Sequence, residues 1–223
     1  MRKIILGIIA LSFIFGCGYS YLYYRVGNTA GFVSAYRDSG TKWAQIEKSV
    51  YSPGADSNPV RQNVNAILTR VLNESTSEKE RFSLSVAGAD PLAALHSEIE
   101  IMKTNREGLE QKVVSLREKA DEVKGIRARR KAEEIVFLSE KRLAMMKEVE
   151  DLSYQMNDAV KAIFQGVAGD GGKLTDDRIR VLNDQVPEAE KDYERLNELY
   201  RNIGDSKAEI KKAYNEFNAL AGK

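Results

Sequence analysis

Few residues of this sequence have the types and spacing that enzymatic chemistry requires. His96 is the only histidine, so neither a His-pair zinc motif nor a His-assisted nucleophile can be assembled around a second one. We interpret His96 as a surface residue near a helix start. Asp90, Glu98 and Glu100 are the best carboxylates for a site between helices, although acidic residues are abundant on any solvated helix. We therefore expect no enzyme, cofactor or metal, and an enzyme or ligand-binding module is the alternative.

A glycine-rich segment, Gly169–Lys173, superficially resembles a phosphate-binding loop. Val167 stands where the first glycine of that motif is required, and Leu174 follows the lysine in place of Ser or Thr. Three nearby aspartates lack the alternating spacing of an EF-hand calcium loop: Asp170, Asp176 and Asp177. The segment is therefore predicted to be a plain turn between two helices.

Five basic residues lie close together in the middle of the chain: Lys124, Arg127, Arg129, Arg130 and Lys131. They could contact lipid headgroups or another anion. Because Glu122, Glu133 and Glu134 flank them, a charged solvent-facing helix surface also explains the run.

The first 24 residues have the layout of an export signal. Arg2 and Lys3 precede an uncharged run from Ile4 to Gly16, and the only cysteine, Cys17, follows it. The segment Ile14–Cys17 resembles the cleavage site of bacterial lipoprotein signals. The resemblance implies cleavage before Cys17, acylation of its sulfur by palmitate-type chains, and attachment of the mature chain to a bilayer.

An uncut transmembrane anchor is the alternative reading of the same segment. Ile4 to Tyr24 carries no formal charge, and as a helix it would span about 30 Å, the thickness of a hydrocarbon core. Arg2 and Lys3 would then stay in the cytoplasm. Both readings place the bulk of the chain outside the cytoplasm, in a bacterial cell envelope, and make the bilayer a partner through Cys17 or residues 4–24.

Composition favours a helical protein with balanced charge. The chain has 34 basic and 33 acidic residues, 43% hydrophobic residues and four prolines among 223 residues. Near-neutral net charge gives no reason to expect nucleic acid as a partner. With Cys17 in the anchor, no cysteine remains for a disulfide.

Residues 25–88 are predicted to form an N-terminal helical subdomain. Apolar residues recur there at helical spacing: Phe32, Tyr36, Trp43, Ile46 and Val50. Pro53-Gly54 indicates a turn, and Asn58-Pro59 indicates a helix start. We interpret 73–88 as a connection with at most a short helical piece.

Residues 89–223 are predicted to form a long helical hairpin with arms at about 91–165 and 175–221. The first arm has a coiled-coil seam with Arg106 in one core slot, comprising Leu95, Ile99, Met102, Leu109, Val113, Leu116, Ala120 and Val123. The pattern resumes one residue out of phase after Gly125, so local unwinding or a bend at Gly125 is expected; it then runs through Leu138, Met145, Val149, Leu152, Met156, Ala159 and Ile163. The seam of the second arm comprises Leu182, Val186, Ala189, Tyr193, Leu196, Tyr200, Ile203, Ile210, Tyr214, Phe217 and Ala221, with Lys207 interrupting it.

The sequence thus predicts an all-α fold: an N-terminal signal or anchor segment at 1–24, followed by a helical bundle with a long antiparallel coiled-coil hairpin. We expect a structural, spacer or adaptor component of the envelope, with a protein partner or self-association through the arms. A membrane-active component of secretion or lysis type is a further alternative.

Overall fold

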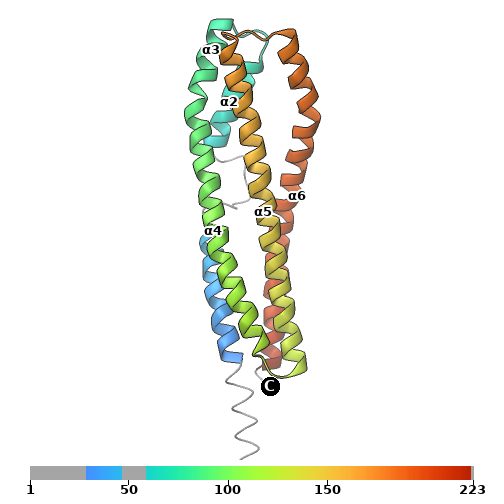
Figure 1. Ribbon diagram of the computed structural model, residues 1–223. Helices are drawn as coiled ribbons and strands as arrows, with labels where there is room; N and C mark the ends of the chain where they lie inside the picture. The colour runs from blue at the N-terminus through green and yellow to red at the C-terminus, as the bar shows by residue number, and fades with distance from the viewer. Residues whose placement is uncertain (1–28, 47–58, 222–223) are drawn as a thin grey trace, which may run out of the picture. The chain divides into compact units, whose positions relative to one another are not determined.

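The protein is all-α, as the sequence predicts. The computed structural model describes residues 29–46 and 59–221, and the regular structure in these ranges is helical (Figure 1). Residues 29–46 are helical, and five further helices follow: α2 (Pro59–Leu72), α3 (Glu78–Ala87), α4 (Ala89–Asp121), α5 (Ile126–Gly169) and α6 (Asp176–Ala221). Cys17, residues 1–24, Val50 and the Pro53-Gly54 turn lie outside the described residues.

The predicted first arm is two helices, because the chain reverses at Gly125. Arg117 on α4 pairs with Glu140 on α5 at 2.6 Å, whereas in one continuous helix these residues would lie about 35 Å apart. The turn depends on Gly125, whose φ of +99° is rarely accessible to other residues. Local unwinding and a bend at Gly125 were the two possibilities for residues 91–165. The bend is correct, and it reverses the direction of the chain.

The chain divides into two compact units, the first built from three separate stretches of the chain and the second from two. Unit 1 comprises the described residues up to Trp43, Leu109–Lys141 and the end of α6 from Ser206. Its core includes Phe32, Leu116 and Phe217, and the rings of Phe32 and Phe217 lie 4.8 Å apart between centroids. Tyr36 stacks on Tyr214 at 3.6 Å. The helical stretch from residue 29 to 43 is therefore part of this core.

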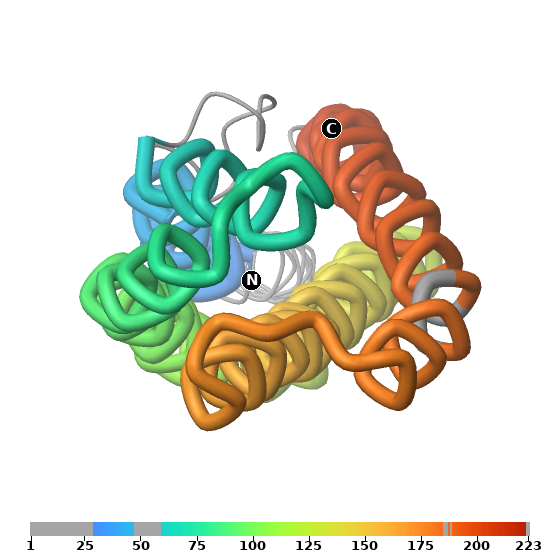
Figure 2. The backbone as a smooth tube through the Cα atoms, turned by 90° about the horizontal axis from the view of Figure 1, so that it is seen from above, coloured from blue at the N-terminus to red at the C-terminus, as the bar shows by residue number. Residues whose placement is uncertain are grey.

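Unit 2 comprises the described residues within Ala44–Gly108 and Arg142–Asp205. In this unit α5 lies between α4 and α6 (Figure 2), with ion pairs to each neighbour. One core cluster joins α2 to α4 and α5 through Val64, Val71, Leu92, Phe164 and Val167. Gly88 is required here, because a Cβ at this position would overlap the ring of Phe164.

The predicted seam of α4 is confirmed almost completely. Except for Leu95, which is half-buried, each predicted apolar residue from Ile99 to Val123 is buried, and Arg106 is buried among them. Steps of three and four residues keep one face of a helix toward its neighbours.

The predicted phase of α5 is wrong. Of the predicted seam, Val149 alone is buried, whereas Leu138, Met145, Leu152, Met156 and Ile163 are half-buried and Ala159 is exposed. The buried face runs instead through Ala132, Ile135, Val136, Ser139, Arg142, Leu143, Met146, Val149, Glu150, Ser153, Asn157, Phe164 and Val167. Polar side chains occupy the middle of this buried face. The apolar pattern in the sequence therefore follows the half-buried residues on either side of it.

The second half of the predicted α6 seam is confirmed at every seventh residue, at Leu196, Ile203, Ile210 and Phe217. The intermediate buried positions are Leu199, Ser206 and Ala213, each one residue before the predicted ones. Ala189 and Tyr193 are exposed, contrary to prediction. The helix continues through Pro187.

The region 73–88 contains a ten-residue helix, α3, that the sequence signalled through a cap. The Ser77 hydroxyl accepts a hydrogen bond from the Glu80 backbone N–H, which satisfies one of the free N–H groups at the start of the helix. The composition of this region did not indicate a helix start, because α3 contains few apolar residues.

The glycine-rich segment is a turn, as predicted. Gly171 and Gly172 have φ of +65° and +89°, and the Gly172 N–H donates to the Val167 carbonyl at 2.8 Å. Thr175 then caps α6 by accepting from the Arg178 N–H at 3.3 Å. A Cβ at Gly172 would overlap the Glu78 carbonyl, so the turn packs directly against the start of α3.

Candidate functional site

Two cavities between the helices of unit 2 form the candidate functional site. The first, of about 380 Å³, lies among α2, α4, α5 and α6, and its apolar wall includes Leu92, Leu95, Ile99 and Met156. The second, of about 540 Å³, lies among α3, α4 and α5. Helix-lined apolar cavities with a few polar groups are where small molecules commonly bind.

Asn157 lies in the wall of both cavities. Its side chain is 4% exposed, and its Oδ1 has no hydrogen-bond partner among the described residues. A buried amide oxygen without a donor costs roughly 1–3 kcal/mol. The buried Ser85 hydroxyl, in the wall of the second cavity, likewise has no partner within residues 29–46 and 59–221. A ligand with a hydrogen-bond donor would satisfy either atom.

A cluster of three side chains, His96, Glu100 and Tyr154, joins α4 to α5, and His96 of this cluster lines the second cavity. The Tyr154 hydroxyl donates to a Glu100 carboxylate oxygen at 2.6 Å, and His96 Nε2 lies 4.0 Å from the same oxygen. The rings of His96 and Tyr154 meet edge to face at 5.5 Å. Burial, together with donation to the Glu100 carboxylate, raises the pKa of Tyr154 to about 12, whereas the same bond lowers the pKa of Glu100.

A buried ion pair joins α4 to α5 in the same unit. Arg106 Nε donates to both carboxylate oxygens of Glu150, at 2.9 and 3.0 Å. Burial raises the pKa of Glu150, and Arg106 opposes this shift in part. The pair supports the helix interface rather than a reactive site, because both charged groups are directed at each other.

The carboxylates expected to form a site do not converge. Asp90 is exposed in the first turn of α4, and Glu98 and Glu100, two residues apart, point in different directions around the helix. Of these three carboxylates, only Glu100 belongs to a cluster, together with His96. The His96 side chain is half-exposed, as expected for a surface histidine. In the described ranges no group of three metal-ligating side chains occurs.

Sequence reasoning missed Tyr154 and Asn157. Each lies on α5 opposite an α4 residue that becomes its neighbour only after the chain reverses at Gly125. No local pattern marks either residue.

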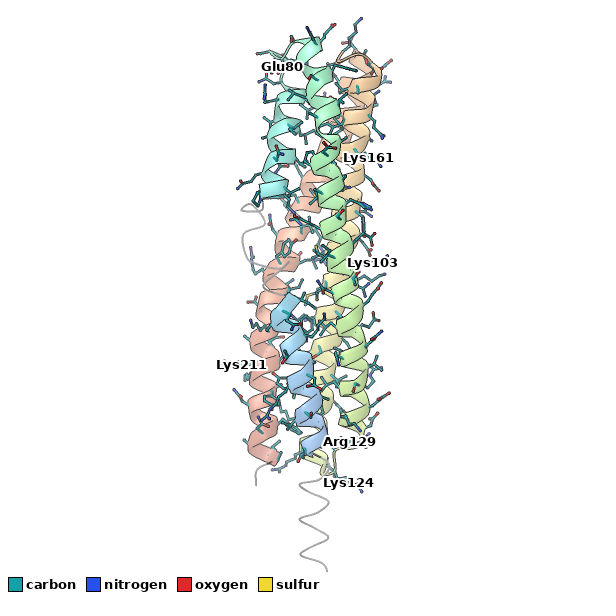
Figure 3. All side chains as sticks on the ribbon, turned by 90° about the vertical axis from the view of Figure 1, so that its left-hand side faces the viewer. Glu80, Lys103, Lys124, Arg129, Lys161 and Lys211 are labelled. Atoms are coloured by element: carbon teal, nitrogen blue, oxygen red, sulfur yellow. The ribbon has the colours of Figure 1, made fainter. Side chains whose placement is uncertain are left out.

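The basic run lies in unit 1, at and after the turn between α4 and α5 (Figure 3). Arg129 pairs with Asp121 at 3.2 Å and with Glu133 at 2.9 Å, and Lys131 pairs with Glu134 and Glu216, each at 2.6 Å. Arg127 and Arg130 are exposed and have no ion-pair partner in the part of the chain that the structure describes. The run is thus only partly neutralised by its acidic neighbours.

The proposed lipidation residue, Cys17, and the segment 4–24 lie outside the described residues. Among the helices in 29–46 and 59–221, none is both long and apolar enough to cross a membrane.

The fold defines the class: an all-α bundle of long antiparallel helices with helix-lined cavities. No family model, curated protein or solved structure matches the chain.

Proposed function

We propose that the protein is a membrane-tethered helical spacer or adaptor outside the cytoplasm of a bacterial cell. The observation that carries this proposal is the position of Phe32, which is fully buried in the core of unit 1. Only residues 25–28 lie in sequence between the apolar segment 4–24 and Thr29, the first residue that the structure describes. The leader is therefore joined to a folded unit by a short connection, as a membrane tether should be.

Unit 1 also offers a surface for a partner helix. A groove of about 280 Å³ lies between α4 and α5, bordered by Phe137 and by the Arg117–Glu140 ion pair. Phe137 is 64% exposed. Aromatic residues are enriched at protein–protein interfaces, so an exposed phenylalanine at the border of a groove supports a surface that another protein covers. A second helix, from another protein or another copy of this chain, is the occupant that suits such a groove.

Intact-mass measurement of the membrane-extracted protein tests the tether. Loss of residues 1–16 with added acyl mass on Cys17 would identify a lipoprotein, and an intact N-terminus in the membrane fraction would identify a transmembrane anchor. Recovery of the native chain in the soluble fraction would contradict the proposal.

The adaptor role is tested by cross-linking the membrane-embedded full chain. Phe137→Glu should abolish cross-links to a neighbouring protein or copy, because it places a charge in the covered groove. Ile101→Glu is the matched control, since Ile101 is also exposed, at 55%, but lies outside the groove. Equal cross-linking by the two variants would contradict a role for the groove.

A ligand-binding module is the second candidate, favoured by the Oδ1 of Asn157, which lies between two cavities and has no hydrogen-bond partner in the described part of the chain. An elongated apolar molecule with one hydroxyl suits this environment. We expect 1-decanol to raise the melting temperature of the protein more than decane does, and Asn157→Ala to remove that difference. Asn183→Ala, at an exposed position of α6, should leave it unchanged. No difference between the two probes would exclude this role.

A further inference from the structure

The turn between α4 and α5 lies at the end of unit 1 from which the described chain begins. A Cβ on Gly31 would be 3.4 Å from the Lys119 side chain, and Phe32 shares a core cluster with Ala120 and Val123. Figure 3 shows Lys124 and Arg129 at this end of the unit. The start of the described chain and the turn are therefore neighbours.

The turn carries concentrated positive charge. Residues 124–131 include five basic and no acidic residues. Arg129 and Lys131 are held by neighbouring carboxylates, whereas Arg127 and Arg130 are exposed and have no ion-pair partner among the residues described. These two guanidinium groups remain available to phosphate oxygens, which they bind in a bidentate geometry.

Ile126 adds an apolar group to the same turn. It directly follows Gly125, and its side chain is 77% exposed, more than any other large hydrophobic residue of the described chain. An exposed isoleucine beside unpaired arginines is the combination that inserts at a lipid interface, with the apolar group among acyl chains and the cations at headgroups.

The length of the chain keeps this turn near the bilayer. From Tyr24 to Thr29 a fully extended backbone spans at most about 18 Å, and from Cys17 to Thr29 about 43 Å. A transmembrane anchor therefore keeps Thr29 within about 18 Å of the membrane, and a lipidated Cys17 keeps it within about 43 Å, so the turn can reach the membrane surface in both cases.

We propose that the turn at residues 122–125 and the start of α5 rest on the anionic surface of the membrane that holds the chain, with Arg127 and Arg130 at lipid phosphates and Ile126 between headgroups. The inference depends on the proposed membrane tether and adds a second, orienting contact to it. Ile126 favours a lipid surface over a nucleic acid or an acidic protein, because neither requires an exposed aliphatic side chain beside the cations.

The test uses the full chain in vesicles of phosphatidylethanolamine and phosphatidylglycerol. Photoreactive p-benzoylphenylalanine replaces Ile126, and intact mass after illumination reports adducts that carry one phospholipid. The same replacement at Ile101, exposed on α4 about 30 Å before the end of that helix, is the positional control. We expect lipid adducts at position 126 and essentially none at position 101.

Charge is tested by Arg127→Glu combined with Arg130→Glu. We expect the adduct yield at position 126 to fall at least about fivefold, because opposing charges replace attraction to the anionic surface. Lys103→Glu with Lys211→Glu changes net charge equally, at exposed positions of α4 and α6 that are not part of the turn, and should leave the yield unchanged. Equal yields in the two double variants, or in purely zwitterionic phosphatidylcholine vesicles, would overturn the proposal.

Flotation of the same vesicles separates this inference from the tether. A chain that floats without adducts at position 126 overturns the surface contact alone, whereas a chain that does not float overturns the tether and the contact with it. Inorganic phosphate should not suppress the adduct more than chloride at equal ionic strength. Stronger suppression by phosphate would assign the turn to a free anion and would overturn the proposal.

Discussion

Arg106 of α4 and Glu150 of α5 form a buried ion pair in which one guanidinium nitrogen lies 2.9 Å from one carboxylate oxygen and 3.0 Å from the other. Glu150 is 2% exposed and Arg106 is 9% exposed. Removing water from two charges is costly, and their attraction repays that cost only while both are present.

Breaking this pair should destabilise unit 2 strongly. Glu150→Ala leaves the Arg106 charge buried without its main partner, so the free energy of unfolding should fall by about 3–5 kcal/mol. Chemical denaturation of the full chain measures this change. Arg117→Ala, which breaks the more exposed pair with Glu140, is the control and should cost about 0–1 kcal/mol. Similar losses in both variants would contradict the importance of burial.

The pH dependence of the unfolding free energy should show the raised pKa of the Glu150 carboxyl. Its pKa is raised in the folded state by burial, so the folded protein binds this proton more tightly than the unfolded chain does. The resulting stabilisation is complete below the ordinary glutamate pKa and is lost as pH rises through the raised value. Unfolding free energies of wild type and Glu150→Gln, measured across this window, should differ in slope, with the steeper decline in wild type. Parallel curves would show that Glu150 titrates normally.

The Tyr154 phenol should lose its proton at a higher pH than an ordinary tyrosine. Ultraviolet titration should find one phenol with a pKa of about 12, because burial and donation to the Glu100 carboxylate both disfavour the phenolate. Glu100→Gln should lower this pKa toward the ordinary tyrosine value, since it removes the negative acceptor. Glu98→Gln, on a different side of α4, should not change it. An unshifted phenol in the wild-type protein would show that the hydrogen bond is not formed in solution.

Two glycines at the turn between α5 and α6 should respond differently to alanine. Gly172→Ala combines a positive φ with overlap on the Glu78 carbonyl, so its melting temperature should fall substantially. Gly169→Ala, at the end of α5 with open space around a new Cβ, should be neutral or stabilising by up to about 1 kcal/mol. Equal melting temperatures would mean that the turn does not pack against α3.

The sequence predicts the helices better than it predicts what they enclose. The α4 seam is correct because apolar residues and one arginine occupy its buried face in regular steps. The α5 face escaped prediction because Ser139, Arg142, Ser153 and Asn157 occupy its centre. Burial of such residues is decided by neighbours on other helices, and those neighbours depend on the direction that the chain takes at Gly125.

The cavities were unpredictable for the same reason. Their walls combine side chains from several helices, and the cluster of His96, Glu100 and Tyr154 exists only because α4 and α5 run antiparallel. Sequence spacing brought His96 and Glu100 together on one helix face, but it gave no indication of Tyr154.

The contact between Phe32 and Phe217 has a consequence for biogenesis. These rings belong to the first and last described helical stretches, so at about 5–20 residues per second the ribosome needs roughly 10–40 s to deliver the second after the first. A leader of the kind proposed would be engaged by the export machinery well before unit 1 can close. During that interval the apolar side of residues 29–46 is uncovered. We therefore expect a holding chaperone to bind the nascent chain at this stretch.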